Sequence, residues 1–540
     1  MTGRSSILPE NSVTGRTQGE AVPSERSRKV FPPIYSVSMF RFRTDGIMFA
    51  IDPVTALLVI FFCLFLIKNF YERKDNLFKN FPPGPKPLPI IGNIHQLNLK
   101  RPYKTFLELS KTYGPVFTVQ IGSQKMVLLC GYETVKDALV NYAEEFSERP
   151  YVPIFHDLSK GNGVLFSGGE NWKVMRRFTL STLRDFGMGK KSIEDKMNEE
   201  SDFLVKSFKS YGGKPFADPV ILNAAVANII VSIMLGHRFD YNDPVFLRLM
   251  GFINENIRLM GTPMVMLYNN FNSIFRWFPG SHRKVQENAV KTQKFIKETF
   301  TKHKERLDVN DQRTLIDTFL VKQQEEKSEF ASYYHNENLT MLVSNLFAAG
   351  MDTTSTTLQW GLLLMIKYPE IQKNVQNEIE KVIGSSEPQS EHRKKLPYTD
   401  AVIHEIQRFA NIIPTNLPHA TAKDVTFKGY FMPKGTYVMP LLTSVLRDEA
   451  YFKKPDEFYP QHFLDSEGNF VKNEAFLPFS AGKRSCAGEN LAKMELFIFF
   501  TRLLQNFTFQ APSGTKLDLT PAVGFTTPPV PHLICAIPRA

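Results

Sequence analysis

The longest regular pattern in the sequence is a run of about thirty residues, from Asn338 to Lys367, with helical periodicity and a mainly apolar surface. As one straight helix this run would be about 45 Å long. Six further segments before residue 410 also have helical periodicity, and short stretches typical of strands occur in the chain as well. We therefore predict a mostly α-helical fold with small β-sheets.

The predicted elements cover the chain from about residue 100 to its end. No second linker interrupts this part, so we expect one large domain over residues 99–540. Within it we expect helices over 103–112, 171–184, 193–210, 286–306, 338–367, 370–383 and 399–409, and strands over 116–121, 126–129, 425–427 and 437–440.

The N-terminal part of the sequence indicates a disordered extension followed by a membrane anchor. Residues 1–45 are rich in Ser, Arg, Thr and Pro and lack periodicity, which predicts a disordered extension. Residues 46–67 are largely apolar, and about twenty helical residues span the roughly 30 Å of a bilayer's hydrocarbon core. We predict a transmembrane anchor there; a cleaved signal peptide and a buried core helix are the alternatives. Lys68, Arg73 and Lys74 follow, which indicates that the bulk of the chain faces the cytosol.

Two further features concern how the chain begins. Translation from Met48 would remove the extension, and we hypothesise that residues 1–47 are absent from some or all of the mature protein. Residues 68–98 are basic and proline-rich, and the prolines from Pro82 to Pro89 exclude a helix. This segment is either a generic linker or a stiff strut that orients the domain on a membrane.

The overall composition excludes several function classes. The net charge is +11, but no long basic run with interleaved aromatic residues is present, so we expect no nucleic-acid partner. A mild basic excess instead suits an acidic protein partner or anionic membrane lipid. Four scattered cysteines in 540 residues cannot form a disulfide framework and fit a reducing compartment. The mean hydropathy of −0.21 excludes a protein with many membrane spans and leaves room for one.

Cys486 has the most unusual surroundings of the four cysteines. It follows Gly482, Lys483 and Arg484, precedes Gly488, and stands just before a predicted helix over residues 489–504. Backbone N–H groups and the dipole at a helix N-terminus stabilise a thiolate. A lone cysteine is more often an inert core residue, but the glycines, Arg484 and the helix together favour a ligand role.

The middle of the long helical run contains Ala349-Gly-Met-Asp-Thr-Thr354, in which Asp352 and Thr353 are poor residues for a helix interior. They indicate a local opening of the helix that places a hydroxyl, a carboxylate and a water beside a reaction centre. The alternative is a threonine bonded back to its own helix, next to a paired aspartate.

Two residue pairs lie at helical spacing. Trp172 and Arg176 share one face and offer N–H donors to an anionic group, or else simply pack at the surface. Glu405 and Arg408 are expected to form an ordinary structural ion pair.

These residues together resemble the cytochrome P450 family. Phe479-x-x-Gly-x-Arg-x-Cys-x-Gly488 is similar to the haem-thiolate signature at every defined position, residues 349–354 resemble the oxygen-activation motif, and Glu405-x-x-Arg408 resembles a further family motif. The proline segment, Trp172-Lys-x-x-Arg-Arg177 and Leu417-Pro-His419 resemble the microsomal second family, whose members oxidise drugs and lipids. His462 stands where many other members have an arginine that packs on the Glu-Arg pair.

The resemblance implies a role for each matching residue. Cys486 would be the axial thiolate ligand of the iron of haem b, and Trp172, Arg176, His419 and Arg484 would pair with the haem propionates. Asp352 and Thr353 would hold the water that delivers protons during oxygen activation.

The resemblance also implies a monooxygenase that inserts one oxygen atom from O₂ into a small apolar substrate. Segments 151–165, 252–278, 412–417 and 524–529 would line the substrate cavity. Electrons would come from NADPH through NADPH–cytochrome P450 reductase, with cytochrome b5 as a further donor, at the endoplasmic reticulum membrane. Alternatives are a P450-type isomerase or dehydratase that rearranges a peroxide without a reductase, and a haem carrier or sensor without turnover.

A basic patch could receive the reductase. Lys173, Arg177, Lys483 and Lys493 are expected on the side of Cys486, where they would steer an acidic partner. The alternative for each of them is an ordinary solvated side chain.

Overall fold

The computed structural model describes residues 40–44, 47–62, 65, 80–186 and 191–539. The chain divides into two compact units, Met1–Phe70 and Tyr71–Ala540. In the first unit, β1 (Phe40–Thr44) and β2 (Ile47–Ile51) form an antiparallel hairpin in which Thr44 lies opposite Ile47. Residues 53–62 are helical.

The predicted anchor over residues 46–67 lies partly outside the described residues, as does most of the predicted extension. Its helical part begins after Asp52, whose carboxylate accepts hydrogen bonds from the backbone N–H groups of Val54 and Thr55 at 2.9 and 3.0 Å. Such an N-terminal cap fixes where a helix starts. In the portion of the chain that the structure describes, no helix combines the length and the apolar character that crossing a membrane requires.

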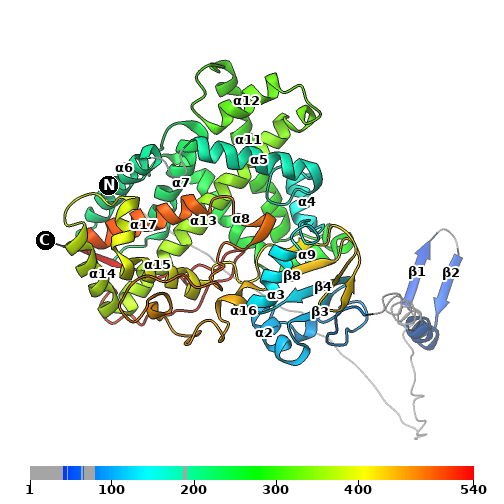
Figure 1. Ribbon diagram of the computed structural model, residues 1–540. Coiled ribbons are helices and arrows are strands. Elements are labelled where there is room, and N and C mark those ends of the chain that lie inside the picture. The colour runs from blue at the N-terminus through cyan, green and yellow to red at the C-terminus, as the bar shows by residue number, and fades with distance from the viewer. Residues whose placement is uncertain (1–39, 45–46, 63–64, 66–79, 187–190, 540) are drawn as a thin grey trace, which may run out of the picture. The chain divides into compact units, whose positions relative to one another are not determined.

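The second unit is mostly helical, as predicted (Figure 1). Its longer helices are α2 (Pro102–Tyr113), α5 (Gly169–Asp185), α6 (Lys191–Lys209), α7 (Pro219–Leu235), α8 (Pro244–Met260), α9 (Pro263–Asn270), α11 (Ser281–Glu305), α12 (Leu315–Glu325), α13 (Asn336–Lys367), α14 (Pro369–Val382), α15 (Pro397–Ala410) and α17 (Glu489–Asn506). Short helices are α3 (Tyr132–Lys136), α4 (Pro153–Ser159), α10 (Asn272–Phe275), α16 (Leu442–Leu446), η1 (Ile94–Gln96), η2 (Asp137–Asn141), η3 (Ala331–Tyr333), η4 (Ser390–Lys395), η5 (Pro460–Phe463) and η6 (Gly482–Arg484).

The strands of the second unit form small sheets. One four-stranded sheet has the order β3-β4-β8-β5, in which β4 and β8 are parallel and the other pairs are antiparallel. Two-stranded pairs are β6 with β7 and β9 with β10. The strands are β3 (Val116–Ile121), β4 (Gln124–Leu129), β5 (His419–Ala420), β6 (Val425–Phe427), β7 (Tyr430–Met432), β8 (Tyr437–Pro440), β9 (Phe507–Gln510) and β10 (Cys535–Pro538).

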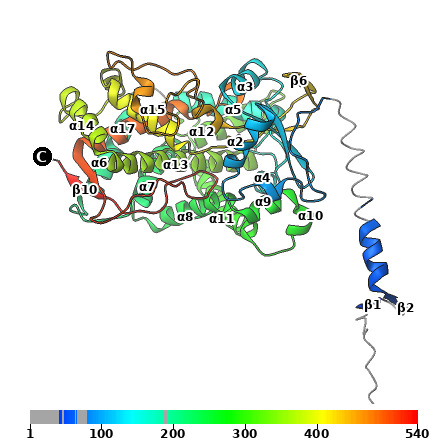
Figure 2. The same cartoon turned by 90° about the horizontal axis from the view of Figure 1, so that it is seen from below.

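Helix α13 is the central element of the second unit. Figure 2 shows it running through the body between α7 on one side and α15 and α17 on the other. It begins where the His335 side chain accepts a hydrogen bond from the Asn338 N–H, and it ends before Pro369, which cannot continue a helix. Most of its side chains are buried, and many belong to the largest hydrophobic cluster. Helix α13 is therefore at the centre of the core, and the neighbouring helices pack against it.

The proline-rich segment is attached to the sheet. The Pro83 carbonyl accepts a hydrogen bond from the Thr118 N–H of β3 at 2.7 Å, and Asn93 is bonded to Gln120 through both its backbone and its side chain. A Cβ at Gly84 would lie 1.9 Å from the Thr118 carbonyl oxygen, so only glycine permits this approach. Residues 80–93 therefore belong to the body of the second unit.

The predicted ion pair of α15 is confirmed as a structural feature. The Arg408 guanidinium donates two hydrogen bonds of 2.7 Å to Glu405, and both side chains are fully buried. His462 in η5 lies 3.1 Å from the Glu405 carboxylate, and Arg408 also bonds the Pro455 carbonyl oxygen. The pair therefore ties α15 to the segment over residues 455–462, whose backbone groups and His462 bind the remaining donors and acceptors of the pair.

Candidate active site

Cys486 lies between a tight turn and a helix. The turn is η6, and α17 starts three residues after the cysteine. The Cys486 N–H donates to the Phe479 carbonyl oxygen at 3.0 Å, which closes the loop. Gly482 has φ +70°, and a Cβ there would lie 1.7 Å from the Leu139 carbonyl oxygen. Glycine is therefore required at this position, because the loop presses against η2.

The side chain of Cys486 is exposed, although many protein atoms surround its sulfur. Burial among protein atoms raises the pKa of the thiol, while the Gly488 N–H and Arg176 act in the opposite direction. The sulfur thus faces a space inside the fold and not the outer surface. Without a cation the thiol stays protonated at neutral pH, whereas coordination to a metal ion would deprotonate it.

A group of arginines, together with a tryptophan and a histidine that offer N–H donors, surrounds the Cys486 loop. Arg176 of α5 donates to the Ser485 carbonyl oxygen at 2.8 Å. The Arg484 guanidinium donates to the Ser147 carbonyl oxygen at 2.6 Å and lies 3.7 Å from the centre of the Trp172 ring. His419 and Arg149, described next, complete what we call the cationic cluster: Arg149, Trp172, Arg176, His419 and Arg484.

His419 and Arg149 are held by backbone carbonyl groups. The Nδ1 atom of His419 lies 2.7 Å from the Phe146 carbonyl oxygen and so carries a proton. Arg149 donates to the Pro418 carbonyl oxygen at 2.6 Å and to the Leu165 carbonyl oxygen at 3.2 Å. The cluster therefore joins α5, the segment before α4, β5 and the Cys486 loop.

Several donors of the cationic cluster are buried without a partner. The indole N–H of Trp172 and both terminal nitrogens of Arg484 have no hydrogen bond, and the Glu148 carboxylate is 3.9 Å from Arg484. Burial and the neighbouring Arg149 and Arg176 lower the pKa of Arg484 to about 8. Burial, followed by the guanidinium groups of Arg149 and Arg484, lowers the pKa of His419 to about 3.

Buried positive charges that repel one another are costly unless an anion is present. A buried group with two carboxylates would satisfy the free donors and reverse the pKa shifts. The free donors of the cluster would therefore suit the two propionates of a haem whose iron would be bound by Cys486. Sequence analysis had brought forward four of its members. It missed Arg149, because an arginine in a Glu-Arg-Pro loop without a helical partner carries no local signal.

Asp352 and Thr353 lie at the middle of α13. The Thr353 hydroxyl donates to the Ala349 carbonyl oxygen at 2.8 Å, and the Asp352 carboxylate accepts from the Thr526 hydroxyl at 2.7 Å. The helix is continuous through this segment, so the predicted local opening is not present in this structure. Burial raises the pKa of Asp352 to about 6, and the Thr526 bond opposes this shift. Ala349 is exposed although α13 is central, so α13 also borders an internal space here.

A cavity of about 280 Å³ lies beside the cationic cluster. All four predicted wall segments contribute to its lining, with residues such as Phe155, Met260, Ile413 and Phe525. Pro418 also lines it, and the carbonyl group of Pro418 binds Arg149. The lining is predominantly apolar, which is typical of a site for a small apolar molecule. Its charged members are Lys100 and Arg101, which lie outside the predicted wall segments.

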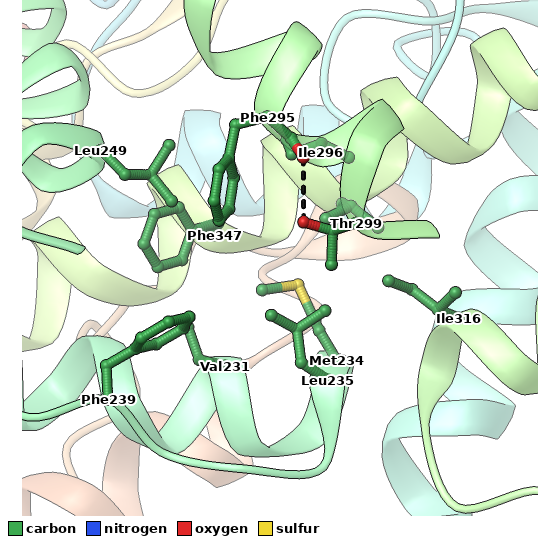
Figure 3. A pocket seen from close by; sticks show the side chains of 11 residues that line it. Val231, Met234, Leu235, Phe239, Leu249, Phe295, Ile296, Thr299, Ile316 and Phe347 are labelled. Carbon is green, nitrogen blue, oxygen red and sulfur yellow. Dashed lines mark hydrogen bonds between the residues drawn. The ribbon is translucent and has the colours of Figure 1, made fainter. Parts of the chain in front are cut away.

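A second cavity of about 20 Å³ lies among α7, α8, α11, α12 and α13. Figure 3 shows apolar side chains around it, and its single hydroxyl, that of Thr299, is already bonded to the Phe295 carbonyl oxygen at 2.9 Å. A cavity of this size has room for about one water molecule but offers it no free polar partner. We interpret it as a small packing void and not as a substrate site.

The comparisons with known proteins agree with this geometry. The sequence model of the family "Cytochrome P450" matches residues 82–536, which contain the Cys486 loop, the cationic cluster and α13. The chain belongs to the cytochrome P450 family. Cytochrome P450 2K4 of Oncorhynchus mykiss is 49% identical over 92% of this chain and 99% of its own length. Cytochrome P450 2C5 of Oryctolagus cuniculus is 48% identical (90% and 100%), and cytochrome P450 2C8 of Homo sapiens is 47% identical (89% and 99%).

The relatives confirm the predicted resemblance to the second P450 family. The P450 is accordingly a haem-dependent monooxygenase, an oxidoreductase, and its family binds haem iron through a thiolate.

The lysines of the predicted basic patch are present at the surface of this P450 as members of ion pairs. Lys173 pairs with Glu170, Lys493 with Glu489 at 2.6 Å, and Lys483 with Glu144. Arg177 lies 6.0 Å from the centre of the Phe330 ring. Each of these lysines therefore already has an acidic neighbour on the same surface.

Proposed function

We propose that this P450 inserts one oxygen atom from O₂ into a small apolar substrate, and that the Cys486 thiolate would bind the iron of haem b. The observation that carries the proposal is the cationic cluster, whose buried donors on Trp172 and Arg484 lack partners beside the Cys486 loop. A buried group with two carboxylates would accept hydrogen bonds from these donors and balance the charge of the arginines.

The residues around the sulfur prepare it for this role. The Gly488 N–H and the Arg176 guanidinium both favour the ionised form of Cys486. When bound, the haem supplies the oxidising chemistry, and a thiolate ligand favours cleavage of the O–O bond. A carboxylate beside His419 would raise the pKa of this ring and let Nε2 donate as well.

Asp352 and Thr353 are proposed to deliver protons. A hydroxyl has one donor and two acceptor positions, so Thr353 can accept a hydrogen bond from a water while it donates to the Ala349 carbonyl oxygen. Asp352, with a pKa raised to about 6 by burial, is close to the range in which an acid can give up and regain a proton at neutral pH.

The 280 Å³ cavity supports a small apolar substrate. Most of its accessible lining is aromatic and aliphatic, which favours an apolar molecule, and its two charged side chains lie outside the predicted wall segments. Electrons are proposed to come from NADPH through NADPH–cytochrome P450 reductase, with cytochrome b5 as a further donor. Lys173, Arg177, Lys483 and Lys493 would meet the acidic partner, which would compete with Glu144, Glu170 and Glu489 for the lysines.

Attachment to the endoplasmic reticulum membrane is proposed for two reasons. The first is the apolar segment within residues 46–67. The second is a group of large apolar side chains in and after α10: Ile274, Trp277 and Phe278 are 56%, 70% and 54% exposed. Exposed apolar groups of this kind mark contact with lipid or with another protein.

Reduction of the purified protein under carbon monoxide tests the ligand. We expect a strongly red-shifted Soret band that Cys486→Ala abolishes and Cys130→Ala, which changes a buried cysteine elsewhere, retains. Intact, haem-loaded protein without this band would overturn the proposal. NADPH consumption with reductase and a substrate-dependent product would then separate the monooxygenase from a carrier or sensor. Rearrangement of a peroxide without reductase would instead show an isomerase or dehydratase.

A further inference from the structure

The loop over residues 522–527 belongs to both the substrate cavity and the proposed proton-delivery site. Val523, Gly524, Phe525 and Thr527 line the cavity. Thr526 stands among them, but it is buried and its hydroxyl donates to the Asp352 carboxylate of α13 at 2.7 Å. One short loop thus contacts the space for the substrate on one side and the acid on the other.

The loop is held firmly to its surroundings. The Phe525 N–H donates to the Ile257 carbonyl oxygen of α8, and the Thr527 N–H to the Ile412 carbonyl oxygen, each at 2.9 Å. The Trp360 indole of α13 donates to the Thr527 carbonyl oxygen at 2.9 Å. These bonds on both sides of Thr526 define the position of its hydroxyl relative to α13.

The Asp352 carboxyl is directed toward the loop and not toward Thr353. Neighbouring residues on a helix project about 100° apart, so their side chains do not face each other. The Thr353 hydroxyl donates back to the Ala349 carbonyl oxygen, while the Asp352 carboxylate accepts from Thr526. Only Oδ2 of Asp352 is bonded to Thr526, so this bond fixes the direction of the carboxyl group while Oδ1 keeps its acceptor positions for a water.

We propose that Thr526 is a positioning residue for proton delivery: it holds the Asp352 carboxyl against the loop that lines the substrate cavity. Thr526 thereby sets both the direction of this carboxyl and its affinity for a proton. The step that it controls is a proton transfer, in which the carboxyl group releases its proton toward Thr353 and regains one from water. The inference rests on the proposed role of Asp352 and Thr353.

The electrostatic surroundings leave Thr526 as the principal specific influence on Asp352. Burial is the main cause that raises the pKa of Asp352, the Thr526 bond lowers it, and no charged side chain contributes among the described residues. Helix α7 and the loop carry no titratable side chain. On other elements that contact α13, Glu495 bonds Thr354, Lys297 pairs with Glu337, and the α15 pair is internally satisfied.

The test replaces the hydroxyl while keeping the shape of the side chain. We expect Thr526→Val to raise the pKa of Asp352 by about one pH unit, since one hydrogen bond to the charged form is lost. The readout is the infrared carbonyl stretch of the protonated carboxyl in ferric holoenzyme, assigned as the band that Asp352→Asn removes. Thr526→Ser should restore the wild-type titration. Thr520→Val, the same change at an exposed site in the C-terminal segment, should leave it unchanged.

A second readout follows the flow of electrons. With reductase and NADPH, we measure the peroxide released per NADPH as a function of pH. In Thr526→Val this profile should move to higher pH by the same number of pH units as the infrared titration. An unchanged carboxyl band in folded, haem-loaded Thr526→Val would overturn the inference, as would a shifted band with an unchanged peroxide profile. If the wild type consumes no NADPH, the proposed function fails, while the infrared titration still decides whether Thr526 controls Asp352.

Discussion

At the scale of single residues, we expect the retention of haem to depend on individual side chains of the cationic cluster, and Arg149 is one of them. It is half-buried and bonded to backbone carbonyl oxygens. Desolvation, followed by its neighbour Arg176, lowers its pKa to about 9. We expect Arg149→Leu to weaken haem retention by at least about tenfold, because a carboxylate left without its buried partner is costly. The rate at which haem transfers from the P450 to apomyoglobin would measure this retention. Arg177→Leu, which removes an exposed arginine of α5 outside the cluster, should leave retention unchanged.

Thr353 allows a second test at the residue scale. We expect Thr353→Ala to increase the peroxide released per NADPH several-fold, because the hydroxyl that would bind the proton-delivering water is lost. Thr357→Ala is a matched control, since Thr357 makes the same kind of bond to the Thr353 carbonyl oxygen one turn further along α13. Equal peroxide release from both variants and the wild type would show that proton delivery does not depend on Thr353.

A glycine decides the path of the cysteine loop. Gly482→Ala places a methyl group 1.7 Å from the Leu139 carbonyl oxygen in addition to the cost of φ +70°. Gly468→Ala has a similar φ of +84° with nothing within 4 Å, so it reports the backbone cost alone, about 1 kcal/mol. We expect Gly482→Ala to lower the melting temperature and the haem content clearly more than Gly468→Ala. Equal losses would mean that the close approach to η2 is not required.

At the scale of elements, a buried carboxylic acid joins α13 to α17. Glu495 accepts a hydrogen bond from the Thr354 hydroxyl at 2.9 Å, next to Thr353, and burial raises the pKa of Glu495 to about 8. The helix that starts behind Cys486 and the helix that carries the proposed proton-delivery residues are therefore connected through a neutral acid.

This connection makes stability depend on pH. Between the unfolded-state pKa, near 4.5, and the folded-state pKa, about 8, the folded protein holds a proton on Glu495 that the unfolded chain has lost. The free energy of unfolding should therefore fall as pH rises through this window, by about 1.4 kcal/mol per pH unit for this group. Asp352 acts in the same direction only up to about pH 6, while the lowered pKa values of His419 and Arg484 act in the opposite direction at the two edges of the range from pH 6 to 8. The contribution of Glu495 is therefore read from the difference between the wild type and a Glu495 variant.

We expect Glu495→Gln to remove this component of the slope, because glutamine keeps the shape and the hydrogen bond without titrating. Urea unfolding of both proteins between pH 6 and 8 measures the difference. Parallel curves would contradict a protonated Glu495 in the folded state.

At the scale of the whole molecule, association with a reductase should depend on salt. We expect Lys173→Gln combined with Lys483→Gln to raise the reductase concentration for half-maximal NADPH oxidation a few-fold at low salt, with little difference at high salt. Lys302→Gln with Lys304→Gln, at the far end of α11, removes the same charge elsewhere. If both double variants behave alike, the effect would come from net charge and not from the proposed patch.

Several helices that sequence analysis predicted have one buried face, whereas α7, which it missed, is buried on nearly all sides. The predicted strands over 116–121, 425–427 and 437–440 coincide with β3, β6 and β8, and α5, α6 and α11 were found because one face of each is apolar. Helix α7 was missed, because nearly all its side chains are buried and no polar face gives it a period. Helices α8, α9 and α12 were also absent from the expected set.

The sequence alone determined the mostly helical fold and the family, and it singled out Cys486 as the candidate ligand, because periodicity and the spacing around Cys486 are local properties of the chain. Only the tertiary structure decided which groups stand together. Arg149 joined the cationic cluster, Thr526 reached Asp352 across 174 positions, and the lysines of the patch met their acidic neighbours. Such contacts depend on how distant segments pack around α13, and burial then sets the proton affinities of the groups that meet there.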